Sequence, residues 1–470
     1  LPDTPRWLLP AATGTGLVAA VCFPYAPTGI GVVLTAVALT LAVLPAVRHR
    51  ITPWSVAYSL AAYGLVFVAL FRDADWVVGL SLLAAFVLAS LALSGGRGWA
   101  GVTRGLLSVG LAVFPVPWFL AGPVRRVLKR RSLVPVLISL GITAFLVAVF
   151  GVLFISADAV FSSFARDLLS APAWAETLPV RIFLFVFFGV LAAAAILVAL
   201  RPVAQPRVDY APMHVARTLW VIPLVAVNLL FAAFVGVQIS VLFGGTRRVL
   251  ETAGLTFAEY ARSGFFELIA VSVFVLFIVA FCSVMIKGDR WIMATLLGLL
   301  CALTLVILAS ALHRLGLYTA AYGFTRLRAS VGATIWWIAA VFVLVLLGGL
   351  VKRTRWLPKA LVLLTAVSLM VFAVWNPDAQ VAESQVTVRG VDRLDEHYLA
   401  RLSADAIPGL DKLPEPIRSC VLKDVIQTQD LRFPEPWNGW NLSRRKAAEI
   451  LAAHPVNSAV TCEEKYRSPY

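Results

Sequence analysis

Long apolar runs alternate with short polar connections from the start of the chain to residue 375. A membrane-spanning helix needs roughly 20 mostly apolar residues. By that measure the pattern predicts eleven spans, at 7–24, 28–47, 53–71, 76–93, 133–155, 182–200, 219–243, 268–286, 291–312, 332–351 and 357–375. The sequence therefore predicts an all-α polytopic transmembrane helix bundle.

A further apolar stretch, 105–122, decides the predicted topology. It contains Pro115 and Pro117, which remove backbone donors from the middle of a helix. Basic connections gather on the cytoplasmic side of a membrane. Those near residues 48–50, 125–131, 201–217 and 352–359 share one side only when 105–122 is re-entrant or packs as a broken helix at the inner face. We therefore predict eleven spans, with twelve as the alternative.

This topology places the N-terminus in the cytoplasm and the C-terminus outside a bacterial cell membrane. It divides the chain into N-terminal spans at 1–131, a core bundle at 132–375 and a small, mainly helical extracytoplasmic domain at 376–470. The connections 156–181, 244–267 and 313–331 are long and are predicted to form interfacial loops on the outer face, with short helices that cap the bundle. The connection with Arg314, Arg326 and Arg328 breaks the charge rule in both topologies.

Composition supports the bilayer as the main solvent. Apolar residues make up 60% of the chain and charged residues 14%, against about 45–50% and about 25% in soluble domains. The net charge of +15 would suggest nucleic acid in a soluble protein. Here the basic residues fall between apolar runs, so we interpret the charge as topology and expect no nucleic-acid partner.

The predicted outer face carries the best candidate site. Its charged and aromatic residues are Asp158, Glu259, Tyr260, Arg262, Glu267, Tyr322, Arg326 and Arg328. One interpretation is a structural cap, in which the charges pair with each other and the tyrosines lie at the interface. The other is a site where arginines bind an anionic lipid head group or a partner's carboxylate.

Catalytic and metal-binding motifs are absent from the sequence, and the histidines are scattered singly, so we expect no cofactor and no metal. Asn228 and Gln238 are the main polar side chains within predicted spans. Hydrogen bonding between helices explains them, and a transport path is the alternative. The spans hold almost no charged residues, which disfavours an ion-coupled transporter.

The polar tail after residue 375 is predicted to hold three helices, at 395–402, 417–427 and 442–453. If the tail lies outside the membrane, Cys420 and Cys462 are free to form a disulfide. The turn at 437–441 leads into the third helix, which Asn441 or Ser443 could cap. The two tryptophans of this turn are predicted to dock the domain on the bundle, with binding to a partner as the alternative. The basic residues 444–446 are predicted to form a solvated face.

Several segments resemble a family of bacterial multi-pass membrane proteins with a domain of unknown function, the type numbered 4153 or 4173. They are SADAVF at 156–161, AEYARSGFFEL at 258–268, AYGFTRLR at 321–328, NPDA at 376–379 and YLARLSADA at 398–406. The resemblance covers roughly 130–470. It implies the membrane architecture and no particular activity.

These observations predict a non-catalytic accessory, sensing or assembly protein of the envelope, with the lipid bilayer and an envelope protein as partners. A transporter or lipid-handling protein with a site between bundle and outer cap is the first alternative. A membrane-embedded enzyme is the second. The sequence does not indicate an oligomeric state.

Overall fold

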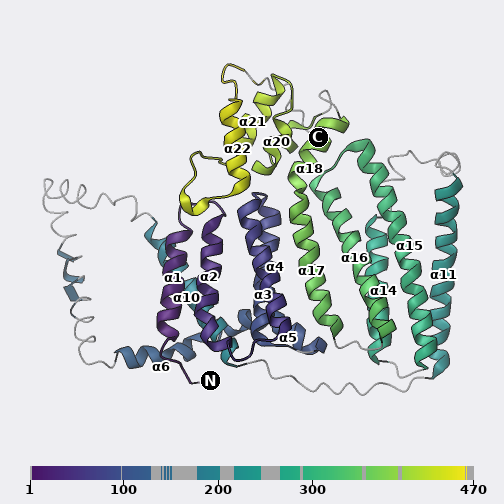
Figure 1. The fold of residues 1–470 in the computed structure, drawn as a ribbon, viewed down its shortest axis with the longest axis horizontal. Coiled ribbons are helices and arrows are strands. Elements are labelled where there is room, and N and C mark those ends of the chain that lie inside the picture. Colours follow the sequence, from purple (N-terminus) through teal and green to yellow (C-terminus); the bar gives the residue numbers. More distant parts are fainter. Residues whose placement is uncertain are drawn as a thin grey trace.

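A computed structural model of the chain describes residues 3–96, 98–128, 177–201, 216–244, 265–285, 289–351, 356–389, 394–460 and 462, with isolated residues between 139 and 150. Every regular element in these ranges is helical. Figure 1 shows a layer of upright helices with a small helical domain over one end. The predicted all-α bundle is confirmed.

The bundle begins with α1(Leu8–Cys22), α2(Ile30–Val47), α3(Pro53–Phe71), α4(Asp75–Ser94), α5(Gly98–Ala112), α6(Val116–Leu128) and α10(Leu178–Leu200). It continues with α11(Arg217–Gly244), α14(Phe265–Met285), α15(Arg290–Tyr322), α16(Arg326–Val351) and α17(Leu357–Trp375). The C-terminal domain holds α18(Pro377–Ser384), η2(Gln385–Arg389), α19(Glu396–Leu399), η4(Ala404–Ala406), α20(Ile407–Leu410), α21(Ile417–Thr428), η5(Trp437–Gly439) and α22(Leu442–Ala453).

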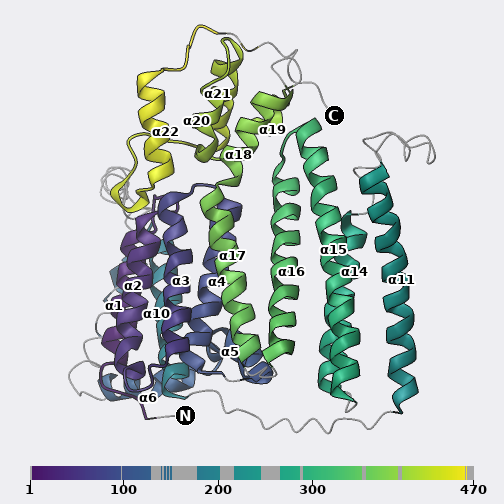
Figure 2. The ribbon, with the colours of Figure 1, turned by 45° about the vertical axis from the view of Figure 1, so that its right-hand side comes forward.

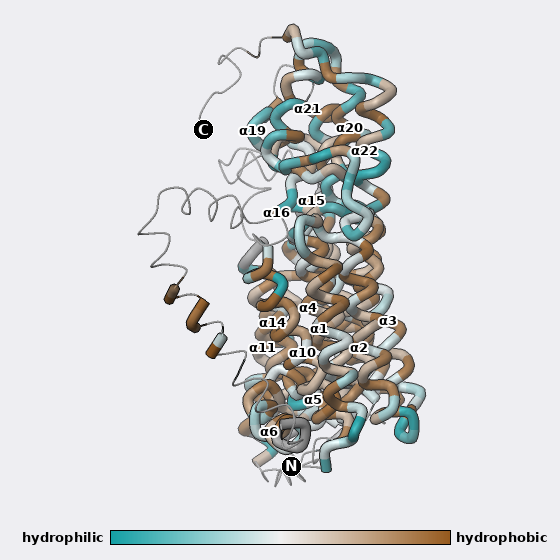
Figure 3. Tube along the Cα trace, turned by 90° about the vertical axis from the view of Figure 1, so that its left-hand side faces the viewer, coloured by the Kyte–Doolittle hydropathy of each residue, from teal (hydrophilic) through white to brown (hydrophobic). Residues whose placement is uncertain are grey.

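Eight described helices are long and apolar enough to cross a membrane, and α1 and 267–283 are shorter apolar helices. Figure 3 shows hydrophobic residues along these helices and hydrophilic residues in the C-terminal domain. The predicted span 133–155 lies almost entirely outside the described residues. The chain is therefore a multi-pass membrane protein, and its total of eleven spans stays a prediction.

Local sequence explains where several helices begin and end. Thr52 forms a capping box with Ser55 at the start of α3. Gly95, at φ 66°, ends α4 in the left-handed conformation that glycine adopts without strain. Asn376, at φ 59°, ends α17, and its side chain accepts from the Ala379 N–H to cap α18. One residue thus joins the last bundle helix to the C-terminal domain.

The two ends of the bundle differ in what they carry. We call the end under the C-terminal domain the domain end, and the end where α1 begins the far end (Figure 1). The helix termini near Arg48, Arg201, Arg217 and Lys359 lie at the far end. The described parts of the predicted basic connections therefore lie together, opposite the C-terminal domain.

The α5–α6 pair bends by 49° around the proline-containing segment that the sequence singled out. Ser90 of α4 hydrogen-bonds to Gly105 and Val109 of α5, and Phe119 of α6 packs in a cluster with Leu8. Figures 1 and 2 show both helices at the far end. The pair is a broken helix at that end rather than a straight span.

One predicted loop is wrong. Residues 313–331 were expected to form an interfacial loop, but α15 continues to Tyr322 and α16 begins at Arg326. Only 323–325 connect them, with Gly323 at φ 70°. The polar residues that interrupt the hydropathy here belong to helix ends, so they were mistaken for a loop. The predicted loops 156–181 and 244–267 lie mostly outside the described residues.

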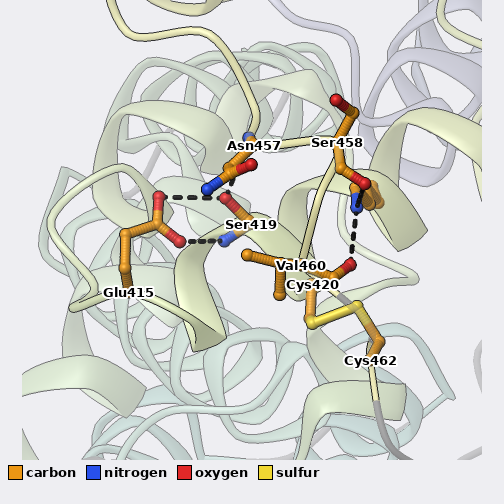
Figure 4. The surroundings of a disulfide bond; sticks show 8 residues. Glu415, Ser419, Cys420, Asn457, Ser458, Val460 and Cys462 are labelled. Carbon is orange, nitrogen blue, oxygen red and sulfur yellow. Dashed lines mark hydrogen bonds between the residues drawn. A yellow bond between two sulfur atoms is a disulfide. The ribbon is translucent and has the colours of Figure 1, made fainter.

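The C-terminal domain has its own hydrophobic core. The three helices predicted for it are present as α19, α21 and α22, and α19 is shorter than predicted. Buried side chains include Val381, Leu399, Ile407, Leu422 and Ala447. Cys420 of α21 forms a disulfide with Cys462, and Lys423 donates to two carbonyls of the same C-terminal segment (Figure 4). The predicted disulfide therefore fastens the end of the described chain to α21.

Candidate functional site at the domain end

Arg444 forms the centre of a buried polar contact between the C-terminal domain and the bundle. Its side chain is 4% exposed and pairs with Asp73, from the α3–α4 turn, and with Glu435. It also donates to the carbonyl oxygens of Thr28, at 2.9 Å, and Gly439. A buried arginine with two carboxylates and two carbonyls has its hydrogen-bonding capacity well used, which buried charges require.

Asp405 makes the reciprocal contact from the domain side. Its fully buried carboxylate accepts from the backbone N–H groups of Asp73, at 2.7 Å, and Ala74, at 3.0 Å. The Ser443 hydroxyl donates to it at 2.7 Å, and Arg72 lies 3.7 Å away. Burial raises the pKa of the Asp405 carboxyl, against the lowering effect of these donors.

Asp378 binds the start of α16 to the domain. The Arg326 Nε donates to Asp378 Oδ1 at 2.8 Å, and Trp76 donates to the same oxygen at 3.2 Å. The Ser403 N–H donates to Oδ2 at 3.0 Å, and the Arg326 N–H donates to the Tyr398 hydroxyl at 2.8 Å. Burial opposes ionisation of Asp378, but the Arg326 guanidinium and Ser403 outweigh it, so its pKa is lowered.

Two asparagines complete the contact. The Asn441 side chain caps α22 by accepting from the backbone N–H groups of Ser443 and Arg444, which was one of the two predicted caps. Its amide donates to the Ala69 and Arg72 carbonyls at 2.9 and 2.8 Å. Asn438 donates to the Cys22 carbonyl at 3.0 Å. We call this whole contact, made by Arg444, Asp73, Asp405, Asp378, Arg326, Asn438 and Asn441, the docking interface.

Two expectations about this segment need correction. The turn at 437–441 does dock on the bundle, but through asparagine side chains and backbone, because Trp437 is 63% exposed. The basic residues 444–446 do not form a uniformly solvated face, because Arg444 is buried while Arg445 is exposed and pairs with Glu449. Position on α22 separates these neighbours, since adjacent helical residues point in different directions.

A cavity of about 520 Å³ opens beside the docking interface, between the domain-end halves of three helices. We call it the α15–α17 groove. Its lining includes Gly316 and Thr319 of α15, Arg328, Gly332 and Trp336 of α16, and Val371 of α17. Trp336 and Val371 are 67% and 63% exposed, so the groove opens towards the surroundings of the bundle.

Arg328 is the charged residue in this lining. Its Nη1 donates to the carbonyls of Tyr322, at 3.1 Å, and Gly323, at 2.6 Å, at the end of α15. Its guanidinium carbon lies 4.2 Å from the Tyr318 ring centroid. No described carboxylate pairs with it, whereas Arg326, two residues earlier, is neutralised by Asp378.

Comparison with known proteins identifies the family. Residues 58–413 match the family described as "Domain of unknown function (DUF4153)". The chain belongs to this DUF4153 family. No curated protein and no solved structure matches it. The match begins earlier and ends earlier than the predicted 130–470. The DUF4153 region therefore includes most of α3, all of α4 and both Asp73 and Asp405, but not Arg444.

The DUF4153 structure separates the predicted outer-face residues. Arg326 and Tyr322 lie near each other at the α15–α16 connection, with Arg328 in the groove. Glu267 lies exposed in the first turn of α14. The other four, Asp158, Glu259, Tyr260 and Arg262, lie outside the described residues.

The intramembrane polar residues make helix-to-helix contacts. Asn228 donates to the carbonyls of Leu224 and Leu296, at 2.8 and 3.2 Å. Gln238 accepts from Ser310, at 2.9 Å, and from Arg314. Neither lines the α15–α17 groove. These contacts join α11 to α15, and they give Arg314 a partner at the domain end.

Sequence reasoning missed the DUF4153 residues that build the docking interface. Asp73, Asp378, Asp405 and Arg444 were not proposed as site residues. A signal was present for two of them, because Asp73 and Asp378 directly follow apolar spans on the predicted outer side. Carboxylates there offer natural partners for outer-face arginines, which the charge rule leaves unexplained.

Proposed function

We propose that this protein is a non-catalytic accessory protein of a bacterial cell envelope that holds a small extracytoplasmic domain in a fixed position on its membrane bundle. The observation that carries the proposal is the docking interface. Arg444 and Asp405 are buried between domain and bundle with specific partners on both sides. Such directional contacts favour one orientation of the domain, because a displaced domain would leave buried charges unpaired.

Three observations support the extracytoplasmic position of the domain. The described helix ends that belong to the predicted basic connections lie at the far end, which is the expected cytoplasmic arrangement. The Cys420–Cys462 disulfide suits an oxidising compartment. The arginines at the domain end that break the charge rule include Arg326, which is neutralised by Asp378.

The function requires that the domain presents a surface to another envelope protein. Its surface carries exposed charges, including the Arg432–Asp430 pair, whose side chains are 81% and 73% exposed. A fixed domain would hold such a surface at a constant height and angle above the membrane. We expect a partner protein there rather than a substrate.

Topology is tested with a membrane-impermeant thiol reagent on intact cells, with and without prior reduction. Modification of Cys420 and Cys462 only after reduction supports the proposal. Modification only after the membrane is broken would place the domain in the cytoplasm and contradict it. The three other cysteines are buried in the bundle and serve as the internal control.

The partner surface is tested by a photo-crosslinking residue at position 432 in living cells. We expect a discrete adduct with an envelope protein, and a weaker one when Arg444→Met releases the domain from the bundle. The same crosslinker at Trp291, exposed at the far end, is the position control. An adduct from position 432 that is unaffected by undocking would contradict a role for fixed orientation.

A further inference from the structure

The domain end of the bundle carries a second feature that the docking interface does not use. The α15–α17 groove is apolar along most of its length, and its volume of about 520 Å³ lies within the range of ligand sites. It opens sideways between helices that cross the membrane, where Trp336 and Val371 are exposed. Its surroundings are therefore lipid hydrocarbon rather than water.

Small residues create the space. A Cβ atom on Gly316 would meet nothing within 4 Å, so the groove is open beside α15. A Cβ atom on Gly332 would lie 3.2 Å from Leu315, so this glycine permits α15 and α16 to approach closely. The resulting hollow is bounded by aromatic rings from α16 and α17, including Trp336 and Trp375.

Arg328 lies at the domain-end limit of this hollow, among aromatic residues typical of the lipid head-group region. The ring centroids of Tyr318 and Tyr322 lie 5.0 Å apart beside it, with the rings tilted by 53°, and Trp375 ends α17 at the same end. Tyrosine and tryptophan are enriched at the membrane–water interface. From Arg328 the groove extends to Trp336, eight residues along α16, or roughly 12 Å at the helical rise per residue.

The guanidinium of Arg328 is held in place with donors to spare. Nη1 is engaged by the two carbonyls at the end of α15, and the ring of Tyr318 lies against the guanidinium. Nε and Nη2 donate to no protein group among the residues that the structure describes. An arginine has five N–H donors in a rigid fork that matches phosphate oxygens. The available edge therefore suits a phosphate.

We propose that the α15–α17 groove binds one acyl chain of a bilayer phospholipid whose anionic head group pairs with Arg328. The bilayer supplies the occupant, because the groove opens to hydrocarbon along its length. The positive charge at its head-group end selects an anionic lipid. From Arg328 to Trp336 the groove holds part of one chain, and the rest of the lipid remains in the surrounding bilayer.

The test uses native mass spectrometry of the full-length protein, titrated in detergent with dioleoyl phosphatidylglycerol or dioleoyl phosphatidylcholine. The two lipids share their chains and differ in net charge. We expect a single phosphatidylglycerol to bind about five-fold more tightly than phosphatidylcholine, since one arginine near an anionic surface contributes about that factor. Equal binding of the two lipids by the unaltered protein would overturn the proposal.

Variants separate head-group from chain recognition. Arg328→Gln is expected to reduce the preference to about one-fold, and Arg328→Lys to retain part of it. Gly316→Leu should fill the groove and weaken both lipids. Its matched control is Gly349→Leu, an exposed glycine of α16 whose Cβ atom also meets nothing within 4 Å. The control for charge is Arg401→Gln, an exposed arginine of the C-terminal domain whose side chain bonds to His397 and to no other residue that the structure describes.

Melting temperature in detergent verifies that each variant folds. Because Arg328→Gln also removes two hydrogen bonds at the end of α15, Gly316→Leu keeps the test decisive if that variant unfolds. Equal lipid binding by Gly316→Leu and Gly349→Leu would contradict the groove as the binding site. Oleate binding that exceeds phosphatidylglycerol binding would identify a fatty acid as the occupant and overturn the phospholipid assignment.

Discussion

The docking interface and the α15–α17 groove lie side by side at the domain end. They differ in the partners that they give to their arginine side chains. In the interface, Arg444 and Arg326 are matched by carboxylates, and little of Arg444 is exposed. In the groove, Arg328 is held by carbonyls and a ring but has no described carboxylate partner. The first arrangement fixes two parts of one chain together, and the second leaves a charge available to something else.

Arg326 and Arg328 make this comparison within one turn of α16. Their α-carbons belong to the same helix start, yet the side chains point to different surroundings, as residues two apart on a helix do. Arg326 faces the C-terminal domain and Asp378. Arg328 faces the groove and the end of α15. Of these two arginines, Arg326 therefore has a structural role and Arg328 is the candidate for binding.

The largest expected effect comes from Arg444→Met, which leaves Asp73 and Glu435 without their buried partner. Removal of one member of a buried ion pair costs about 3–5 kcal/mol. We expect a clear fall in melting temperature in detergent and faster release of the domain by protease. Arg445→Met, one residue away and exposed, is the control and should change stability by less than about 0.5 kcal/mol. Similar effects of both changes would contradict the buried role of Arg444.

Loss of the disulfide should come next. Cys420→Ser with Cys462→Ser opens a link with a sequence separation of 42 residues, which is expected to cost the domain about 2–4 kcal/mol. The effect should be confined to the C-terminal domain, since both cysteines lie there. Hydrogen exchange should therefore quicken in α21 and not in α15 or α16. Equal quickening in both places would show that domain and groove are one cooperative unit.

Asp378→Asn should weaken docking by about 2–3 kcal/mol, because it removes a charge-assisted bond to Arg326, whose side chain is partly exposed. The lowered pKa of Asp378 adds a pH dependence. Its contribution is fully present above the unfolded value near 3.8 and is lost as pH falls through the lower folded value. Domain release by an acid-active protease should therefore rise only below about pH 4.

The contrasting variant at the same interface is Asp405→Asn, for which we expect the smallest effect, about 1 kcal/mol or less at neutral pH. An asparagine carbonyl can still accept from the Asp73 and Ala74 N–H groups, and its amide can face Ser443. The raised pKa of Asp405 also means that ionisation opposes folding. Its contribution therefore declines as pH rises from the unfolded value through the raised folded value, and the variant should lose that dependence.

These interface variants also sharpen the comparison with the groove. Each should retain the preference for phosphatidylglycerol, because Arg328 and the groove lining belong to α15–α17 and not to the domain. Loss of the preference in Arg444→Met would show that the domain shapes the groove. Loss in Asp378→Asn alone would show that Arg326 competes for the lipid once its partner is removed.

Hydropathy predicted the parts of the fold that depend on local pattern. The described spans, the α5–α6 break and the helices of the domain follow from apolar runs, prolines and caps. The ends of α15 and α16 were mistaken for a loop, because hydropathy marks where a helix leaves hydrocarbon and not where it stops. A helix can continue past the membrane surface until it reaches its capping residue, which for α15 is Gly323.

The candidate site was less accessible to sequence reasoning. Arg326 and Arg328 were proposed as a pair, and their different partners depend on where Asp378 lies after folding. Arg444 was assigned to a solvated face, because its partner Asp73 is 371 positions away. Contacts of that separation leave no periodic pattern in a single sequence. The disulfide was predictable because only two cysteines lie outside the apolar runs.

The link between Asn438 and the Cys22 carbonyl has a consequence for how the protein is made. The two residues are 416 positions apart, so the hairpin of α1 and α2 is synthesised long before its polar partner. Until residues 438–441 have been synthesised, the turns of the α1–α2 and α3–α4 hairpins must remain uncovered. They receive their partners only after the tail has reached the same face of the membrane. A ribosome-stalled or truncated product would thus be inserted but unfinished, and its exposed turns would distinguish it from the mature protein.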